Sequence, residues 1–217
     1  LNYGESKTTN SKPFNYDENI LTTPFAKVEF DENGFISSFV DKVAQRELVD
    51  GLPFNTFLMA EDVPMSWDNW DIDADYRLKE KPVKFLGREV ISVGEYLLVV
   101  RITHAVAQNS LLVTDVKFRY DSPQIEFENH LTAGDTHTLI RSEHDTTLFA
   151  QSYKCETQFG NLLRNTYNRE KSDIAKFEVC AHKWADLSED NYGVSILNDS
   201  KYGYDIFENR MRITLMR

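Results

Sequence analysis

Apolar and polar residues alternate in short runs along most of this chain. The clearest run is 110–120, where Leu112, Thr114, Val116 and Phe118 occupy every second position and mostly charged residues lie between them. Because successive side chains of a β-strand point to opposite faces, this spacing predicts strands with one apolar and one polar face. Runs of the same kind occur at 26–30, 35–40, 95–106, 123–132, 137–150, 174–180, 192–198 and 210–216.

The turn between the first two runs predicts a β-hairpin. It reads Asp31-Glu32-Asn33-Gly34, and an Asn-Gly pair tolerates the positive φ that such turns need. Sheets with one apolar face are mostly antiparallel and stack face to face to bury that side. The one stretch that could be helical, 41–50, is too short to determine the architecture. We therefore predict an all-β fold, a large β-sandwich of two large antiparallel sheets.

Length and composition predict one folded domain. The chain has 217 residues, 41% of them hydrophobic, which is enough for a full core and within the range of a single β domain. Residues 1–20 are rich in polar residues and lack an apolar period, so we expect a linker or tail there and a single domain over 21–217.

Charge and hydrophobicity exclude two classes of partner. With 24 Lys and Arg against 35 Asp and Glu, the net charge is −11, which excludes an ordinary nucleic-acid binder because the phosphate backbone requires a basic face. The uninterrupted apolar runs, such as 96–100, are far shorter than the ~20 residues of a membrane span. We expect neither nucleic acid nor membrane as a partner, and an oligomer is left open.

The two cysteines indicate the compartment. Cys155 and Cys180 lie 25 residues apart without metal-ligand spacing or a disulfide framework, so we expect buried free thiols in a reducing cytosol. The chain begins with Leu1, and no charged and then apolar segment typical of a secretory signal opens it. We therefore expect a cytoplasmic protein, of which this chain is a piece.

The stretch 64–76 has the least ordinary composition in the chain. It contains Trp67, Asp68, Trp70 and Asp71 within a region that lacks strand alternation. Aromatic rings beside carboxylates suit a sugar, whose C–H face stacks on a ring while its hydroxyl groups donate to carboxylates. The alternative is that both tryptophans fill the core of a long loop and the aspartates cap turns. A calcium loop is disfavoured because the Gly and final Glu of an EF-hand are missing.

A second polar loop follows the run 192–198. Asn198, Asp199, Lys201 and Tyr202 combine an amide, a carboxylate, a cation and a phenol at the end of a strand, where ligand-binding groups often gather. The alternative is a simple turn, since Asn, Asp and Ser also favour turns.

Catalytic and metal-binding motifs are missing from the sequence. It contains no GxSxG, HExxH, P-loop or GxGxxG motif, and with 35 carboxylates a paired-acid site cannot be recognised by spacing. The histidines occur singly, and each is expected to have a structural or surface role: His104, His130, His137, His144 and His182.

Three ordered runs resemble a known family. They are 64–76 (PMSWDNWDIDADY), 158–189 (QFGNLLRNTYNREKSDIAKFEVCAHKWADLSE) and 192–205 (YGVSILNDSKYGYD). Together they resemble the C-terminal β region of glycoside hydrolase family 38 α-mannosidases, in particular the branch of cytosolic and vacuolar enzymes and their bacterial relatives. The resemblance covers roughly 25–217 and implies a supersandwich of the galactose-mutarotase type.

The resemblance also implies a function for the parent protein. Members of the family are retaining α-mannosidases with a zinc ion and an aspartate nucleophile in an N-terminal α/β barrel, and a β region closes the active site from one side. The zinc and nucleophile motifs do not occur in this chain. We therefore expect no catalytic or metal-binding residue here, and we expect the α-mannoside substrate and the parent's barrel as partners.

Substrate contacts are expected from the two unusual loops. In relatives, a cationic residue occupies the region matching Ser200-Lys201, and an aromatic hydroxyl contributes from the region matching 65–71. The expected substrate-binding residues are Trp67, Asp68, Trp70, Asp71, Asn198, Asp199, Lys201 and Tyr202. We expect the loops to meet at one end of the sandwich. Two departures from the family pattern occur, at 137–142 and at 165–168, and the second puts a substrate role of that loop in doubt.

Two other functions remain open for the chain. One is an independent, non-catalytic carbohydrate-binding module, and the other is a purely structural interaction domain. Composition does not separate them, whereas the three ordered motifs favour the mannosidase domain.

Overall fold

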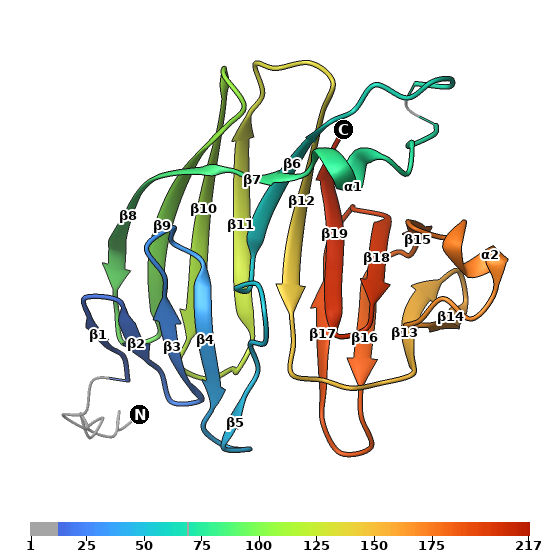
Figure 1. Ribbon diagram of the computed structural model, residues 1–217. Coiled ribbons are helices and arrows are strands. Elements are labelled where there is room, and N and C mark those ends of the chain that lie inside the picture. Colours follow the sequence, from blue (N-terminus) through green and yellow to red (C-terminus); the bar gives the residue numbers. More distant parts are fainter. Residues whose placement is uncertain (1–12, 69) are drawn as a thin grey trace, which may run out of the picture.

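The computed structural model describes residues 13–68 and 70–217 and shows an all-β protein (Figure 1). The described residues form only two helices, α1 (Tyr76–Lys79) and α2 (Lys171–Ile174), each a single turn of four residues. Neighbouring strands pair antiparallel. The stretch 41–50, the one left open for a helix, contains a turn and the short strand β5 (Arg46–Glu47). The all-β, antiparallel part of the prediction is confirmed.

The described strands form four separate sheets. The first contains, in order, β1 (Asn15–Asp17), β2 (Ile20–Thr22), β3 (Ala26–Phe30), β4 (Ile36–Asp41) and β5. The second contains β11 (Ile125–Thr132), β10 (Ser110–Arg119), β9 (Leu97–Val106) and β8 (Lys84–Val93). The third contains β15 (Val179–Cys180), β18 (Gly203–Phe207), β19 (Arg210–Met216), β12 (Thr138–Asp145), β6 (Thr56–Glu61) and β7 (Lys81–Pro82). The fourth contains β14 (Gly160–Asn165), β13 (Ser152–Thr157), β16 (Trp184–Ser188) and β17 (Gly193–Leu197).

The prediction of one large sandwich of two large sheets is therefore wrong, and so is the supersandwich that the family resemblance implies. Four small sheets follow one another in a ring: one apolar cluster joins the first and second sheets, another the second and third, and another the third and fourth. Side chains close the ring, because Tyr192, in the connection between β16 and β17 of the fourth sheet, donates to Asp41 of the first sheet. Glu189, in the same connection, binds Arg46. Alternation predicts which side of a strand is buried, but not how many strands join one sheet.

The period of two itself is confirmed in the second sheet. On β10, Leu112, Thr114, Val116 and Phe118 are all buried, with at most 3% of each exposed. The hairpin of β3 and β4 also forms as predicted, and Gly34 in its turn has φ of +80°. A Cβ atom at this glycine would lie only 2.7 Å from the side chain of Ile102, so close packing excludes larger residues in addition to the backbone strain.

The folded part begins earlier than predicted. The segment 1–20 was expected to be a linker or tail, but β1 lies inside it and Phe14 is 3% exposed in the first core. Phe14 is buried because it packs between the first two sheets, a contact that a polar neighbourhood does not signal. Residues 1–12 lie outside the described part of the chain.

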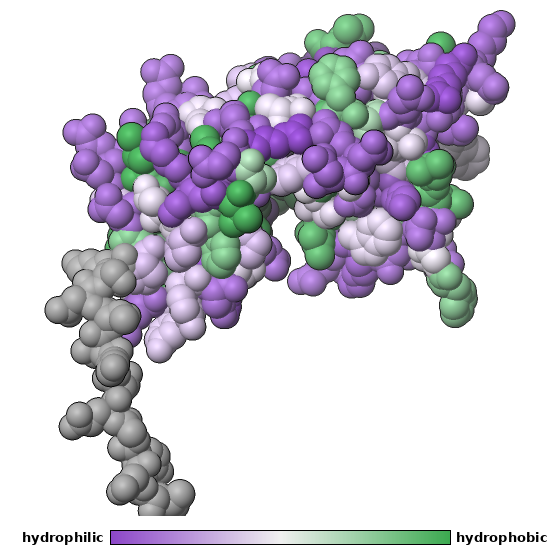
Figure 2. Space-filling view, turned by 90° about the horizontal axis from the view of Figure 1, so that it is seen from below, coloured by the Kyte–Doolittle hydropathy of each residue, from purple (hydrophilic) through white to green (hydrophobic). Residues whose placement is uncertain are grey.

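One of the two cysteines is buried and the other is exposed. Both cysteines are free, and Cys155 is buried as predicted, but the prediction is wrong for Cys180, which is exposed at the edge of the third sheet. Neither of the two short helices among the described residues has the length and hydrophobicity that a membrane-spanning helix needs. Seen from below, hydrophilic side chains cover most of the visible face (Figure 2).

Candidate functional site

The loop before α1 presents its tryptophans to solvent. Trp67 is 75% and Trp70 89% exposed, so the alternative in which they fill the core is wrong. The backbone N–H groups of Trp70 and Asp71 both donate to the carbonyl of Trp67, at 2.8 and 3.0 Å. Asp71 accepts a hydrogen bond of 3.0 Å from the backbone N–H of Ile72, and Asp73 accepts one of 2.9 Å from that of Met65 across the loop, whereas Asp68 is exposed.

The end of β19 holds this loop in place. The guanidinium of Arg217 donates to both carboxylate oxygens of Asp62, at 2.8 and 3.1 Å, and to the backbone carbonyl of Asp71. Two hydrogen bonds between an arginine and one carboxylate fix the orientation of both groups. The position of the loop is therefore set by a contact between residues about 150 positions apart.

The second loop, 198–202, separates into an inward-facing residue and outward-facing ones. The amide of Asn198 donates to the carbonyl of His182 at 2.9 Å and to the hydroxyl of Tyr204, and its oxygen accepts from the N–H of Lys201. Asn198 thus shapes the loop. Asp199, Lys201 and Tyr202 are exposed at its tip.

Neighbouring side chains support this loop from below. The ring of Tyr202 packs edge-on against His182, with 5.5 Å between ring centroids. The ammonium group of Lys183 donates to the carbonyl of Asp199. Burial raises the pKa of Tyr204 to about 12, so its hydroxyl stays protonated as a partner of Asn198.

Both loops lie at the same end of the third sheet. In the antiparallel pair of β18 and β19, Tyr204 lies opposite Ile213, so the start of β18 is beside the end of β19. The loop 198–202 leads into β18, and Arg217 directly follows β19 and binds Asp62 and the backbone of Asp71. Among the described residues, no hydrogen bond or ion pair joins the two loops to each other.

The structure also shows a buried charged face that sequence reasoning missed. Glu143 on β12 lies opposite Arg212 on β19, which in turn lies opposite Asp205 on β18, so the three share one face of the third sheet. None of them is more than 7% exposed. The alternation in the run 137–150 does not predict this burial. The face is covered by α1 and the residues beside it, and these residues come from a distant part of the chain.

Arg141, also on this face, is completely buried. Its guanidinium lies 3.7 Å from the carboxylates of Glu178 and Asp205 and 3.8 Å from that of Glu80, and it donates to the hydroxyl of Tyr76 in α1. Burial raises the pKa of Glu143, although Arg212 and Arg210 oppose this shift. The positive and negative charges of this buried face therefore compensate one another. They lie beneath the end of the third sheet at which both loops are found.

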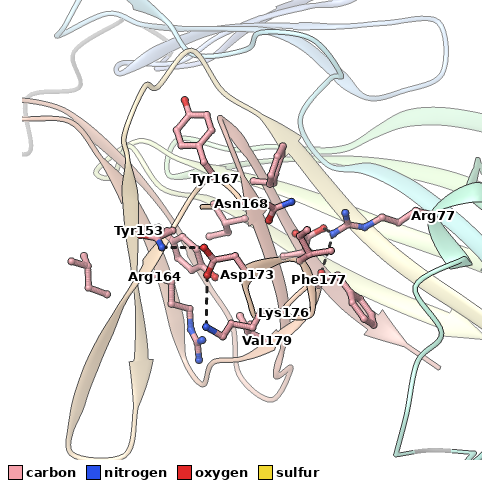
Figure 3. Close-up of a pocket in the computed structure, with 15 residues that line it drawn as sticks. Arg77, Tyr153, Arg164, Tyr167, Asn168, Asp173, Lys176, Phe177 and Val179 are labelled. Atoms are coloured by element: carbon pink, nitrogen blue, oxygen red, sulfur yellow. Dashed lines mark hydrogen bonds and ion pairs between the residues drawn. The ribbon is translucent and has the colours of Figure 1, made fainter. Parts of the chain in front are cut away.

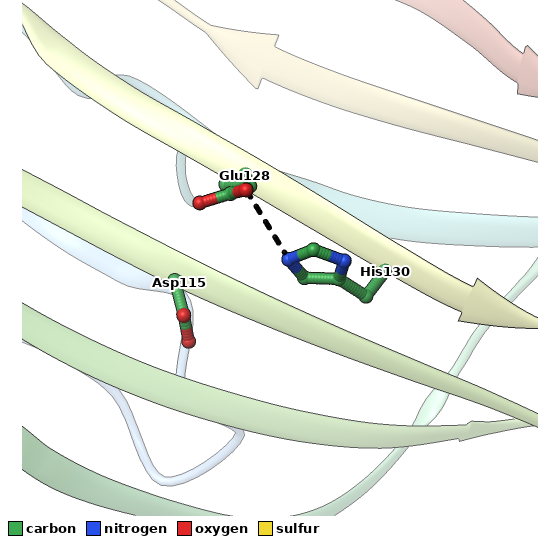
Figure 4. Close-up of side chains that lie close together, drawn as sticks. All are labelled: Asp115, Glu128 and His130. Carbon is green, nitrogen blue, oxygen red and sulfur yellow. Dashed lines mark ion pairs between the residues drawn. The ribbon is translucent and has the colours of Figure 1, made fainter.

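One group of side chains, Asp115, Glu128 and His130, has ligand atoms within 4.8 Å of each other among the described residues (Figure 4). The group does not fit a zinc ion. Arg101 donates two 2.7 Å hydrogen bonds to Asp115, and Lys117 pairs with Glu128, so both carboxylates are already neutralised by cations. Zinc sites instead combine neutral histidine, thiolate and carboxylate ligands that are free of competing cations.

Comparison with known proteins decides the family. Residues 21–217 match the C-terminal domain of the glycosyl hydrolases of family 38. The chain belongs to this family. It is 31% identical to α-mannosidase G of Dictyostelium discoideum over 99% of its own length, and 32% identical to α-mannosidase 2C1 of Homo sapiens over 91%. It covers 21% and 19% of these two proteins, so this family 38 domain spans about a fifth of the length of its curated relatives.

A solved structure has the same fold. An α-mannosidase from Enterococcus faecalis superposes with a TM-score of 0.78 at 14% sequence identity, covering 92% of this chain and 26% of that one. At such low identity the likeness shows the fold alone. The sequence relatives, including an α-mannosidase of Saccharomyces cerevisiae that is 32% identical over 86% of this chain, carry the assignment to the family.

Proposed function

We propose that this family 38 domain belongs to an α-mannosidase that hydrolyses terminal α-mannosides, and that its two loops close one side of the active site. The relatives that are 31–32% identical to it are named α-mannosidases, which supports this substrate class. The observation that carries the role of the loops is their position. Two exposed loops rich in aromatic and polar groups lie at one end of the third sheet.

The exposed side chains suit a pyranose. The indoles of Trp67 and Trp70 offer apolar faces for the C–H groups of a sugar ring, and Asp68 and Asp71 accept from its hydroxyl groups. In the second loop, Lys201 supplies donors, and Asp199 and Tyr202 complete the set. Asn198 acts as a positioning residue because its hydrogen bonds are used within the loop.

The remaining parts of the proposal concern the parent protein. A zinc ion and a retaining mechanism are assigned to the N-terminal barrel, because the one candidate ligand group among the described residues of this domain does not fit the metal. The barrel is then the main partner of this domain. A cytoplasmic location, as expected from the thiols, is part of the same proposal.

The test uses the full-length parent with Lys201→Ala and Asp71→Ala. Each should lower kcat/KM about ten- to a hundredfold, because a charged hydrogen bond to a sugar hydroxyl contributes roughly 1.5 to 3 kcal/mol and ~1.4 kcal/mol corresponds to a factor of ten. The melting temperature should hardly change, because both side chains are exposed. Lys154→Ala and Asp50→Ala remove exposed charges elsewhere and serve as matched controls. Unchanged kcat/KM in both loop variants would remove these loops from the active site.

The second candidate function is a non-catalytic carbohydrate-binding module, which the exposure of Trp67 and Trp70 also favours. It makes a different prediction in the same parent. Trp67→Ala and Trp70→Ala would then weaken binding to immobilised mannan while leaving kcat/KM on a small aryl mannoside unchanged.

A further inference from the structure

A pocket of about 210 Å³ opens where the edge of the fourth sheet meets β15, β18 and α2 (Figure 3). Its walls come from α1, β13, β14, the segment that leads into α2, and β18, so distant parts of the chain build it. None of its lining residues belongs to the two proposed substrate loops. The volume is below the roughly 300–1,000 Å³ of pockets for drug-sized ligands, which limits an occupant to about one sugar ring with a substituent.

A buried tyrosine lines this pocket. Tyr153 is 4% exposed and its ring packs in the apolar cluster between the third and fourth sheets, yet its hydroxyl has no hydrogen-bond partner among the described residues. Burial raises the pKa of this phenol, so the hydroxyl keeps its proton and acts both as donor and as acceptor. A ligand that displaces water from this hydroxyl must supply a hydrogen bond in return, and a sugar hydroxyl does so.

Two ion pairs line opposite parts of the pocket. Arg77 binds Asp205 at 3.0 Å, and Lys176 lies 3.7 Å from Asp173, whose other oxygen accepts from the amide of Asn165. In each ion pair, the N–H donors of the cation lie beside the acceptor oxygens of the carboxylate. Adjacent hydroxyl groups of a sugar match that arrangement, because each hydroxyl both donates and accepts.

The pocket also contains a third cation, which belongs to neither ion pair. Arg164 donates to the sulfur of Cys155 and to the carbonyl of Cys180, but has no carboxylate within ion-pair distance among the described residues. In Figure 3 its side chain and that of Lys176 extend to the same side of the view. An unpaired guanidinium provides a local site for an anion, because planar guanidinium groups bind phosphate and carboxylate through paired hydrogen bonds.

We propose that this pocket binds a single hexose that carries one anionic group, such as a hexose phosphate. The anion lies against Arg164 and Lys176. The ring hydroxyl groups bind the hydroxyl of Tyr153 and the side chains of the two ion pairs in the pocket wall. This site is separate from the substrate loops and does not depend on their role. A bound sugar also stabilises the contact between the third and fourth sheets, because its partners come from both.

The experiment measures binding to the full-length parent by calorimetry and by thermal shift. Glucose 6-phosphate is the probe, because glucose is not the sugar that the substrate loops are proposed to bind. We expect saturable binding and a higher melting temperature with this probe, and at least tenfold weaker binding with glucose or inorganic phosphate alone. Arg164→Gln and Lys176→Gln should each weaken binding at least tenfold, and Tyr153→Phe about fivefold.

Two control variants distinguish this pocket from a general charge effect and from the substrate loops. Lys154→Gln removes an exposed charge from the neighbouring position on β13, outside the pocket, and Lys201→Ala alters the substrate loop, so both should keep full binding. Because Lys176 is exposed, its variant tests the site even if Arg164→Gln disturbs folding. The absence of binding at millimolar probe would overturn the proposal. So would equal affinity for inorganic phosphate, or binding that Lys176→Gln leaves unchanged.

Discussion

The guanidinium of Arg46 donates hydrogen bonds of 2.8 and 3.2 Å to the two carboxylate oxygens of Glu189, 143 positions further along the chain. Arg46 also donates to the carbonyl of Thr147 and lies over the ring of Tyr192, 5.1 Å from its centroid. The pair joins the first sheet to the fourth and closes the ring of sheets. Hydrogen bonding to Arg46 lowers the pKa of Glu189, so this carboxylate stays charged.

This pair should contribute measurable coupling energy to stability. Urea unfolding of Arg46→Met, Glu189→Gln and the double variant should give a coupling of about 1 kcal/mol, the upper part of the range for ion pairs near the surface, because the contact is two-pronged and half-buried. The pair Arg119–Asp121, which is more exposed, is the matched control and should show no measurable coupling. Equal coupling in both pairs would show that closing the ring adds nothing.

His144 should make stability depend on pH. The N–H of Asn55 donates to its Nδ1 atom at 3.2 Å, and its other nitrogen lies 3.1 Å from the hydroxyl of Ser142, so the folded protein holds the neutral ring. Burial lowers the pKa of His144 to about 4. Below pH ~6.5 the unfolded chain takes up a proton that the folded chain does not, so the free energy of unfolding should fall by roughly 3 kcal/mol between pH 6.5 and 4.

A substitution isolates this effect. His144→Gln should flatten the loss of stability between pH 6.5 and 4, while His137→Gln, at an exposed position, should leave it unchanged. Burial also lowers the pKa of His104, which contributes in the same direction and accounts for part of the remaining slope. If denaturant unfolding of His144→Gln keeps the full slope, His144 is not the group that titrates.

Arg141 should be among the costliest side chains to remove. Arg141→Met leaves the carboxylates of Glu80, Glu178 and Asp205 buried with less compensation, and breaking a buried ion pair costs roughly 3–5 kcal/mol. Adding Glu178→Gln should recover part of that loss, because one uncompensated charge disappears. Urea unfolding measures both. A loss within 1 kcal/mol, as is usual for exposed ion pairs, would mean that this network is effectively solvated.

This chain alone should hydrolyse no aryl α-mannoside, with or without added Zn²⁺. Metal catalysis needs a preorganised ligand set, and the group Asp115, Glu128 and His130 is occupied by Arg101 and Lys117. A chromogenic assay with a chelator control measures this. Turnover above the buffer blank that the chelator abolishes would contradict the prediction.

The sequence by itself determined the local structure and the family. Period-two alternation identified strand β10 and its buried face. The turn Asp31–Gly34 identified the first hairpin, and the three ordered motifs identified the family. These features are readable because strand geometry and turn conformation depend on residues next to each other in the chain.

The tertiary structure decided what those strands and loops do together. It alone showed that four small sheets replace two large ones, that Arg141 and Glu143 are buried, that Trp67 and Trp70 are exposed, and that Tyr153 faces a pocket. Each outcome depends on which surfaces meet, and those surfaces are formed by residues far apart in sequence, as in the pair Arg46 and Glu189. Alternation distinguishes two faces of a strand, but only packing against a distant segment decides whether a charged face meets water or another part of the chain.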